Sequence, residues 1–227
     1  MELSVLGFSE LDFESACFAL CHEPPAPGDG YEFLSVPRSL GVTVFRSLDR
    51  DSGIFQYKFY GVLPDVSPDV CAQVYVDLEY RKAWDRTVKE LEYIPTRIGA
   101  VYLEMKFPWP MSNRDYVYDR ELRQLVYNGR TVWVMLAKSL TLPEVPEKRD
   151  VVRVTDFVQT IAVTSDGNMG SKVYMKIFNN PGGSIPVWLI NSLTKSGIAQ
   201  HVYRMQAICR GYPRYLESRM RRSEPGY

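Results

Sequence analysis

The feature that most constrains this sequence is a series of strand-like segments, several of which are apolar on both faces. Between residues 87 and 179 the pattern predicts six strands: 88–93, 100–107, 115–122, 131–139, 151–163 and 172–179. In the fourth, Val132 and Val134 alternate with Trp133 and Met135. A solvated antiparallel sheet alternates apolar and polar residues more cleanly. Both faces of this sheet therefore need to be covered.

Short turns join these strands, and Asn128-Gly129 is the strongest hairpin signal in the chain. Three further strands are predicted over 31–36, 42–48 and 55–63. Consecutive strands joined by short turns form an antiparallel sheet, and the helices are segregated from it in the sequence. The expected class is therefore α+β.

Only one predicted helix is long enough to cover much of a sheet. Over residues 186–216 apolar side chains recur at helical spacing, and Gly211-Tyr212-Pro213 indicates its end. The apolar stripe consists of Leu189, Leu193, Ile198, Val202, Met205 and Cys209. Shorter helices are predicted over 9–20, where Ser9 and Asp12 resemble a capping box, and over 68–77 and 80–85.

A sheet curled around a cavity, with the long helix over its mouth, would cover both faces of the strands. The alternative is a solid core without a cavity. The sequence has neither a linker nor an internal repeat. We therefore expect a single domain over residues 1–216, followed by a polar, disordered tail over 217–227.

Composition narrows the class of partner. The formal net charge is zero, so the electrostatic footprint of a nucleic-acid binder is missing. The N-terminus does not resemble a signal peptide, and no run of eighteen apolar residues is present. Four scattered cysteines (Cys17, Cys21, Cys71 and Cys209) predict free thiols in the cytoplasm and no metal site.

Two sets of polar residues stand out beside apolar ones. Arg81 and Asp85 are four residues apart, so on a helix they share a face and can pair. Such a pair is either a surface salt bridge or a partly buried one that still offers donors to a phosphate. Gln159 lies on the same strand face as Phe157. Its amide is satisfied either by the backbone or by a polar ligand.

Three longer motifs resemble the StAR-related lipid-transfer (START) domain family. They are Tyr80-Arg81-Lys82-x-Trp84-Asp85, the run 107–118 (FPWPMSNRDYVY), and the run 180–191 (NPGGSIPVWLIN). The resemblance extends over about residues 9–215. It implies a helix-grip fold, in which a strongly curved antiparallel sheet surrounds a hydrophobic tunnel that a long C-terminal helix closes. It also implies that the 108–114 loop lies at the tunnel mouth.

The resemblance carries over a set of phospholipid contacts, residue by residue. Tyr75 and Arg81 match positions that approach the phosphate, and Asp85 matches the partner of the arginine. Gln159 matches a further lipid contact, and Tyr116 matches one wall of an aromatic cage around choline. No cofactor is implied.

Two positions depart from that cage, because Leu103 replaces a tryptophan and Phe157 replaces a tyrosine. Losing ring faces weakens the hold on a quaternary ammonium. Ethanolamine lipids therefore become a second possible ligand beside phosphatidylcholine. The alternative is that Tyr118 or Trp133 supplies the missing ring from a neighbouring strand.

The predicted function is non-enzymatic transfer of one glycerophospholipid, with transient contact between the protein and a membrane surface. An enzyme is the first alternative, but the only histidines, His22 and His201, lack an accompanying nucleophile elbow or metal spacing. The second alternative is a lipid-controlled regulator of a protein partner, which would use the same pocket.

Overall fold

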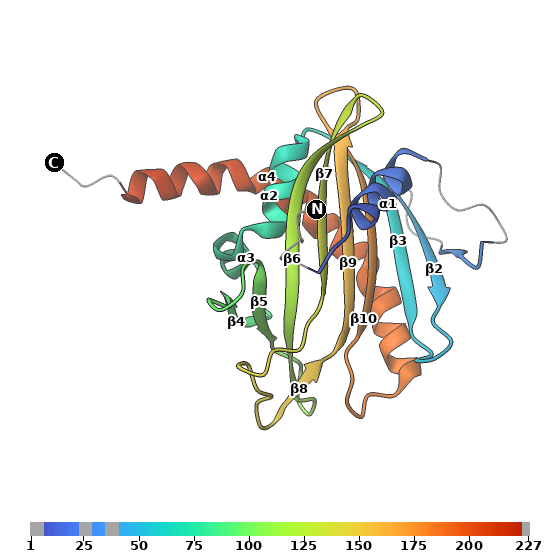
Figure 1. Cartoon of the computed structure of the whole chain (residues 1–227), viewed down its shortest axis with the longest axis vertical. Coiled ribbons are helices and arrows are strands. Elements are labelled where there is room, and N and C mark those ends of the chain that lie inside the picture. Colours follow the sequence, from blue (N-terminus) through green and yellow to red (C-terminus); the bar gives the residue numbers. More distant parts are fainter. Residues whose placement is uncertain (1–6, 23–28, 35–40, 224–227) are drawn as a thin grey trace.

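In the computed structural model, residues 7–22, 29–34 and 41–223 are described, apart from the side chains of 192–203 and 223. The strands form one ten-stranded sheet in the order β1-β2-β3-β10-β9-β7-β6-β5-β4, with β8 paired to β6 (Figure 1). Their bounds are Glu32–Leu34 (β1), Val42–Leu48 (β2), Phe55–Leu63 (β3), Val88–Tyr93 (β4), Ala100–Met105 (β5), Asn113–Tyr127 (β6), Arg130–Ser139 (β7), Val151–Val154 (β8), Asp156–Ser165 (β9) and Ser171–Asn180 (β10).

Turn chemistry sets the register of the central hairpin. Asn128 and Gly129 both have positive φ, 49° and 73°, as a two-residue hairpin turn requires. Tyr127 consequently pairs with Arg130, and β6 and β7 pair from there to Tyr118 and Ser139. The hairpin predicted at Asn128-Gly129 is thus confirmed.

The single strand expected over 151–163 was wrong, because the segment forms two strands. The strand β7 ends at Ser139, opposite Tyr118, so it leaves the first residues of β6 without a partner on that side. The short strand β8 pairs in parallel with Asn113–Tyr116 and fills this position. The chain then crosses to β9, which lies between β7 and β10.

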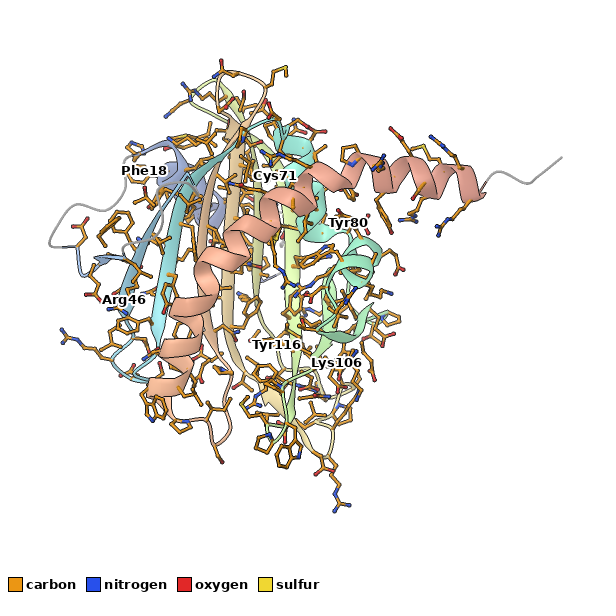
Figure 2. The ribbon with its side chains drawn as sticks, turned by 180° about the vertical axis from the view of Figure 1, so that it is seen from behind. Phe18, Arg46, Cys71, Tyr80, Lys106 and Tyr116 are labelled. Carbon is orange, nitrogen blue, oxygen red and sulfur yellow. The ribbon has the colours of Figure 1, made fainter. Side chains whose placement is uncertain are left out.

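Four helices are described: α1 (Glu10–Cys21), α2 (Pro68–Val76), α3 (Leu78–Trp84) and α4 (Val187–Ser223). The predicted capping box is present, because the Ser9 hydroxyl accepts from the Asp12 N–H and the Asp12 carboxylate accepts from the Ser9 N–H. The helix α4 runs diagonally across one face of the sheet, and its C-terminal end projects beyond the sheet (Figure 2).

The predicted end of the long helix near residue 216 was wrong, because α4 continues to Ser223 with Pro213 inside it. Gly211 serves close packing rather than termination, since a Cβ atom there would lie 3.1 Å from the Tyr80 hydroxyl. That hydroxyl donates to the Ile208 carbonyl at 2.7 Å, and the Tyr212 hydroxyl donates to Asp77 Oδ2 at 2.9 Å. Residues 217–223 are therefore helical rather than disordered, and 224–227 lie outside the described residues.

Both faces of the sheet are covered, as the sequence requires, but by helices on each face rather than by the long helix alone. The inner face packs on α2 and α4, and its buried cluster includes Met135 and Met205. The outer face packs on α1, where Phe13 contacts a cluster that includes Val132 and Val134. The alternation along β7 therefore reflects two separate cores. All four cysteines are free, as predicted.

This packing predicts a large difference between two side chains of α1. Phe13 is fully buried, whereas Leu11 is 71% exposed. Phe13→Ala should lower the free energy of unfolding by about 3–5 kcal/mol, because it leaves a cavity under the helix. Leu11→Ala, the control on the same helix, should change it by less than about 0.5 kcal/mol. Urea denaturation measures both, and equal effects would contradict the docking of α1.

Candidate functional site

A cavity of about 360 Å³ lies between the inner face of the sheet and α2, α3 and α4. All seven of the predicted site residues line it: Tyr75, Arg81, Asp85, Leu103, Tyr116, Phe157 and Gln159. They come from five elements and from the residue after α3, so the fold brings together positions that are far apart in the sequence. The solid-core alternative is therefore wrong.

The cavity continues toward a second, apolar end. A smaller cavity of about 50 Å³ shares Tyr75 and Met205 with the first. Its other walls are Val42, Phe59, Gly61, Val62, Leu63, Val173 and Met175. The lining is polar at the α3 end and mainly apolar at the other, which suits an amphiphilic molecule.

Short helices with defined ends position the polar end. The Asp77 side chain caps α3 by accepting from the Tyr80 N–H at 2.8 Å. One turn later Arg81 Nε lies 3.5 Å from Asp85 Oδ2, and the two side chains are 30% and 11% exposed. The other oxygen of Asp85 accepts from the N–H and the hydroxyl of Thr87. The predicted pair therefore lines a cavity, and its carboxylate is held independently of the arginine.

Arg120 holds the end of α2 and was missed by sequence reasoning. Its guanidinium donates to the Tyr75 carbonyl at 3.1 Å and to the Val76 carbonyl at 2.9 Å. These are the last carbonyls of α2, where the helix dipole favours a cation. The contacts fix Tyr75 against the cavity, and burial raises the pKa of its phenol well above the usual value. Arg120 is four residues from Tyr116 on the same strand, so the two side chains lie on the same face of the sheet. This spacing is the sequence signal that could have identified Arg120.

Three aromatic rings lie together in the wall. Phe157 meets Tyr116 and Tyr118 edge to face, with ring centroids 5.7 Å apart in each case. The Asn179 amide donates to the Tyr116 hydroxyl at 3.2 Å, and burial raises the pKa of Tyr116. Leu103 is paired with Tyr116 across β5 and β6. Tyr118 lines the same cavity, whereas Trp133 lines a different hollow.

Gln159 meets only a weak acceptor among the contacts described, because its amide nitrogen lies 3.7 Å from Met175 Sδ. The charged groups of the lining are Arg81, Arg120, Arg204 and Asp85. Three guanidinium groups and one carboxylate give the cavity lining a net positive charge. The planar fork of N–H donors on a guanidinium matches the geometry of phosphate oxygens. An anionic group of a ligand is therefore favoured at this end.

Arg114 ties together two segments beside this end of the cavity. It is 2% exposed and donates to the Ser112 carbonyl at 2.5 Å and to Pro181 and Gly182 at 3.2 and 3.3 Å. The loop between β5 and β6 is thereby joined to the connection between β10 and α4. Trp109 in this loop is 92% exposed, and Trp188, the second residue of α4, is 71% exposed.

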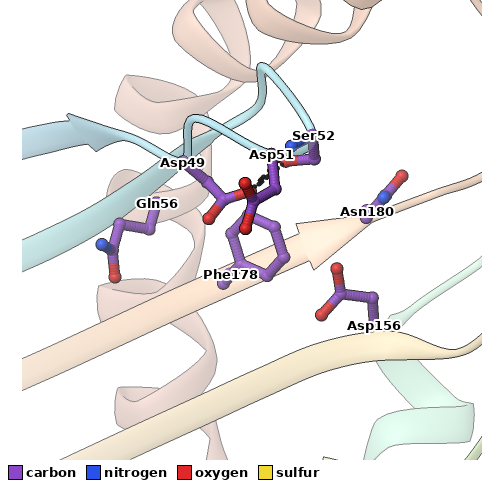
Figure 3. Close-up of a pocket in the computed structure, with 7 residues that line it drawn as sticks. All are labelled: Asp49, Asp51, Ser52, Gln56, Asp156, Phe178 and Asn180. Atoms are coloured by element: carbon purple, nitrogen blue, oxygen red, sulfur yellow. Dashed lines mark hydrogen bonds between the residues drawn. The ribbon is translucent and has the colours of Figure 1, made fainter.

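A larger hollow of about 520 Å³ has the opposite character (Figure 3). Three carboxylates, Asp49, Asp51 and Asp156, contribute to its wall. Asp49 already accepts from the Ser52 N–H at 2.9 Å and the Ser52 hydroxyl at 2.6 Å, within one turn. Its lining is unsuited to hydrocarbon, so the smaller cavity remains the candidate site.

His22 lies away from the cavity, where its ring stacks on Phe18 and contacts the Phe18 carbonyl at 2.8 Å. The side chains of His201, Leu193, Ile198 and Val202 lie outside the described residues. In the part of the chain with described side chains, no group of three or more His, Cys, Asp or Glu is placed to hold a metal ion. None of the described helices has the length and apolar character needed to cross a membrane.

The match to the START domain family covers residues 34–214. The chain therefore belongs to this family, and the α+β helix-grip fold predicted from the motifs is confirmed. The crystal structure of human STARD10 superposes with a TM-score of 0.77 at 22% identity, covering 96% of this chain and 86% of that one. Human StAR-related lipid transfer protein 5 superposes with a TM-score of 0.69 at 14% identity, covering 89% and 96%.

Sequence relatives are closer. Human phosphatidylcholine transfer protein is 44% identical over 213 residues, which cover 93% of this chain and 98% of that protein. The bovine phosphatidylcholine transfer protein is 45% identical over 207 residues, with 91% and 96% covered. The human mitochondrial StAR-related lipid transfer protein 7 is 30% identical over 159 residues, 67% of this chain and 42% of that protein.

Proposed function

We propose that this protein binds one phosphatidylcholine molecule in the cavity under α4 and moves it between membranes. The observation that carries the proposal is the convergence of all seven predicted contacts on one cavity with a cationic end, next to a smaller, mainly apolar cavity. Relatives named phosphatidylcholine transfer protein, 43–45% identical over most of the chain, support the choice of lipid.

The headgroup rather than the acyl chains decides which lipid is carried. Two acyl chains contain about thirty methylenes, worth roughly 25 kcal/mol against water at about 0.8 kcal/mol each. The lipid leaves a bilayer, however, so the cavity replaces one hydrocarbon environment with another and this contribution largely cancels. Polar groups at the α3 end therefore determine selectivity. The protein acts as a carrier rather than a catalyst.

Arg81 is assigned to the phosphate and the aromatic rings to the ammonium. The Arg81–Asp85 pair and the zwitterionic headgroup together carry two positive and two negative charges, which lowers the cost of burying these four groups. Tyr118 supplies the ring that Leu103 lacks, because it borders the same cavity and touches Phe157. A cage of Tyr116, Phe157 and Tyr118 favours a quaternary ammonium over ethanolamine, which needs hydrogen bonds.

Loading requires the walls to separate. The cavity lies under α4, so entry of a phospholipid with two acyl chains moves α4 away from the sheet. The start of α4 is held by Asn191, whose amide donates to the Gly53 carbonyl at 3.1 Å and whose oxygen accepts from the Phe55 N–H. Trp109 and Trp188 are suited to the membrane interface, where tryptophan is enriched. We expect the protein to be cytoplasmic. Contact of these two tryptophans with a bilayer surface would open the cavity at the start of α4.

Arg81→Ala should abolish transfer of phosphatidylcholine between vesicles while the protein stays folded. Asp85 remains satisfied by Thr87, so removing the arginine does not strand a buried charge. Arg81→Lys should rescue poorly, because an ammonium lacks the planar fork. Lys82→Ala is the matched control, since Lys82 lies on α3 and pairs with Glu79 outside the cavity. Full transfer by Arg81→Ala would remove Arg81 from the site.

Tyr118→Leu should reduce the preference for phosphatidylcholine over phosphatidylethanolamine by roughly two- to thirtyfold, corresponding to about 0.5–2 kcal/mol for one ring face. Leu103→Trp should change that preference by less than about twofold, because the cage is already complete. Competition between the two lipids in a transfer assay measures the ratio. A large gain in choline preference in Leu103→Trp, with no loss in Tyr118→Leu, would show that Leu103 is a gap in the cage.

A further inference from the structure

Two N–H groups of α3 are buried without a hydrogen-bond acceptor among the described residues: Arg81 Nε and Trp84 Nε1. Arg81 Nε forms an ion pair with Asp85 at 3.5 Å, a separation without a hydrogen bond. Both residues line the cavity under α4. Buried donors are nearly always paired, so two unpaired donors side by side need an explanation.

Helical geometry places these two donors together. Positions 81 and 84 are three residues apart and therefore neighbour each other on one face of α3. The Trp84 ring packs against the main core while its N–H stays unpaired. Asp85, the nearby carboxylate, already accepts from Thr87 and forms the ion pair with Arg81. Neither N–H has an acceptor among the described protein groups, and the cavity that both residues line is where a ligand could supply one.

The acceptor should be an anion with two oxygens on one atom. A phosphodiester presents two non-bridging oxygens, so one can face the guanidinium while the other faces the indole. The remaining cations of the lining, Arg120 and Arg204, favour the same charge. Loading moves the wall of the cavity, as proposed above, and the two buried N–H groups then become accessible to these oxygens.

We propose that the Trp84 indole N–H donates to a phosphate oxygen of the bound phospholipid, beside the Arg81 guanidinium. The inference rests on the proposed function and deepens it. Trp84 becomes a headgroup contact that selects for phosphate-bearing lipids, in addition to the lipid contacts that the family resemblance implies.

Trp84→Phe tests the contact because it keeps an aromatic ring and removes the donor. Binding of phosphatidylcholine from vesicles should weaken roughly tenfold or more, the factor for one hydrogen bond to a charged acceptor. Trp133→Phe is the matched control: Trp133 also packs on the main core but lines a different hollow. Its affinity should stay within about twofold of the wild type. Unchanged affinity in Trp84→Phe would overturn the inference.

A second measurement, on the wild-type protein, separates a direct contact from a packing effect. The chain has four tryptophans, so the ¹⁵N–¹H spectrum contains four indole signals, assigned by single Trp→Phe variants. Loading with phosphatidylcholine should shift the Trp84 indole proton downfield, as expected for a new bond to an anionic oxygen. An unmoved Trp84 signal on a loaded protein would overturn the inference. Failure of the wild type to load at all would instead overturn the proposed function.

Discussion

The geometry of the site depends on how the ends of two short helices are held. Arg120 reaches from the sheet to the last carbonyls of α2, and Asp77 caps the first turn of α3. Tyr80 and Tyr212 then join this corner to α4 through their hydroxyl groups, at Ile208 and Asp77. Tyr75 and Arg81 lie at this same junction of α2 and α3. The residues that line the polar end of the cavity and the residues that anchor α4 therefore belong to one packed unit.

This arrangement suggests which part of α4 opens. The segment after Met205 is fixed to α2 and α3 by buried aromatic contacts and two hydrogen bonds. The start of the helix is held through the Asn191 side chain, which bonds to Gly53 and Phe55, and Trp188 is exposed there. A membrane that binds this tryptophan would act on that attachment. The helix would then pivot about its tyrosine corner while the phosphate-binding groups stay in place.

Much of the fold could be predicted because strand periodicity and turn residues act locally. The hairpin at Asn128-Gly129 follows from the turn geometry of these two residues alone. The reason for apolar residues on both strand faces could not be deduced, because covering by α1 is a tertiary contact. The end of α4 was misjudged for a similar reason: Gly211 is typical of a helix end, yet its lack of a side chain admits the Tyr80 hydroxyl.

The candidate site was predictable only in part. Its seven expected residues came from the family resemblance, and the structure brings them to one cavity, although their contact with lipid remains a prediction. Tyr118 was named as one possible replacement ring, and Arg120, which lies on the same strand face as Tyr116, could have been found from the alternation of side chains along the strand. Trp84 could not have been found in this way, because an unpaired donor becomes visible only when every neighbouring acceptor is known.

Native mass spectrometry of the full chain tests the central claim most directly, because it weighs the protein together with any retained ligand. Wild-type protein incubated with mixed phosphatidylcholine and phosphatidylethanolamine vesicles should carry one phospholipid per chain, predominantly phosphatidylcholine, and Arg81→Ala should carry none. A wild-type protein that emerges without lipid, or that retains the same lipid equally well as Arg81→Ala, would contradict the account.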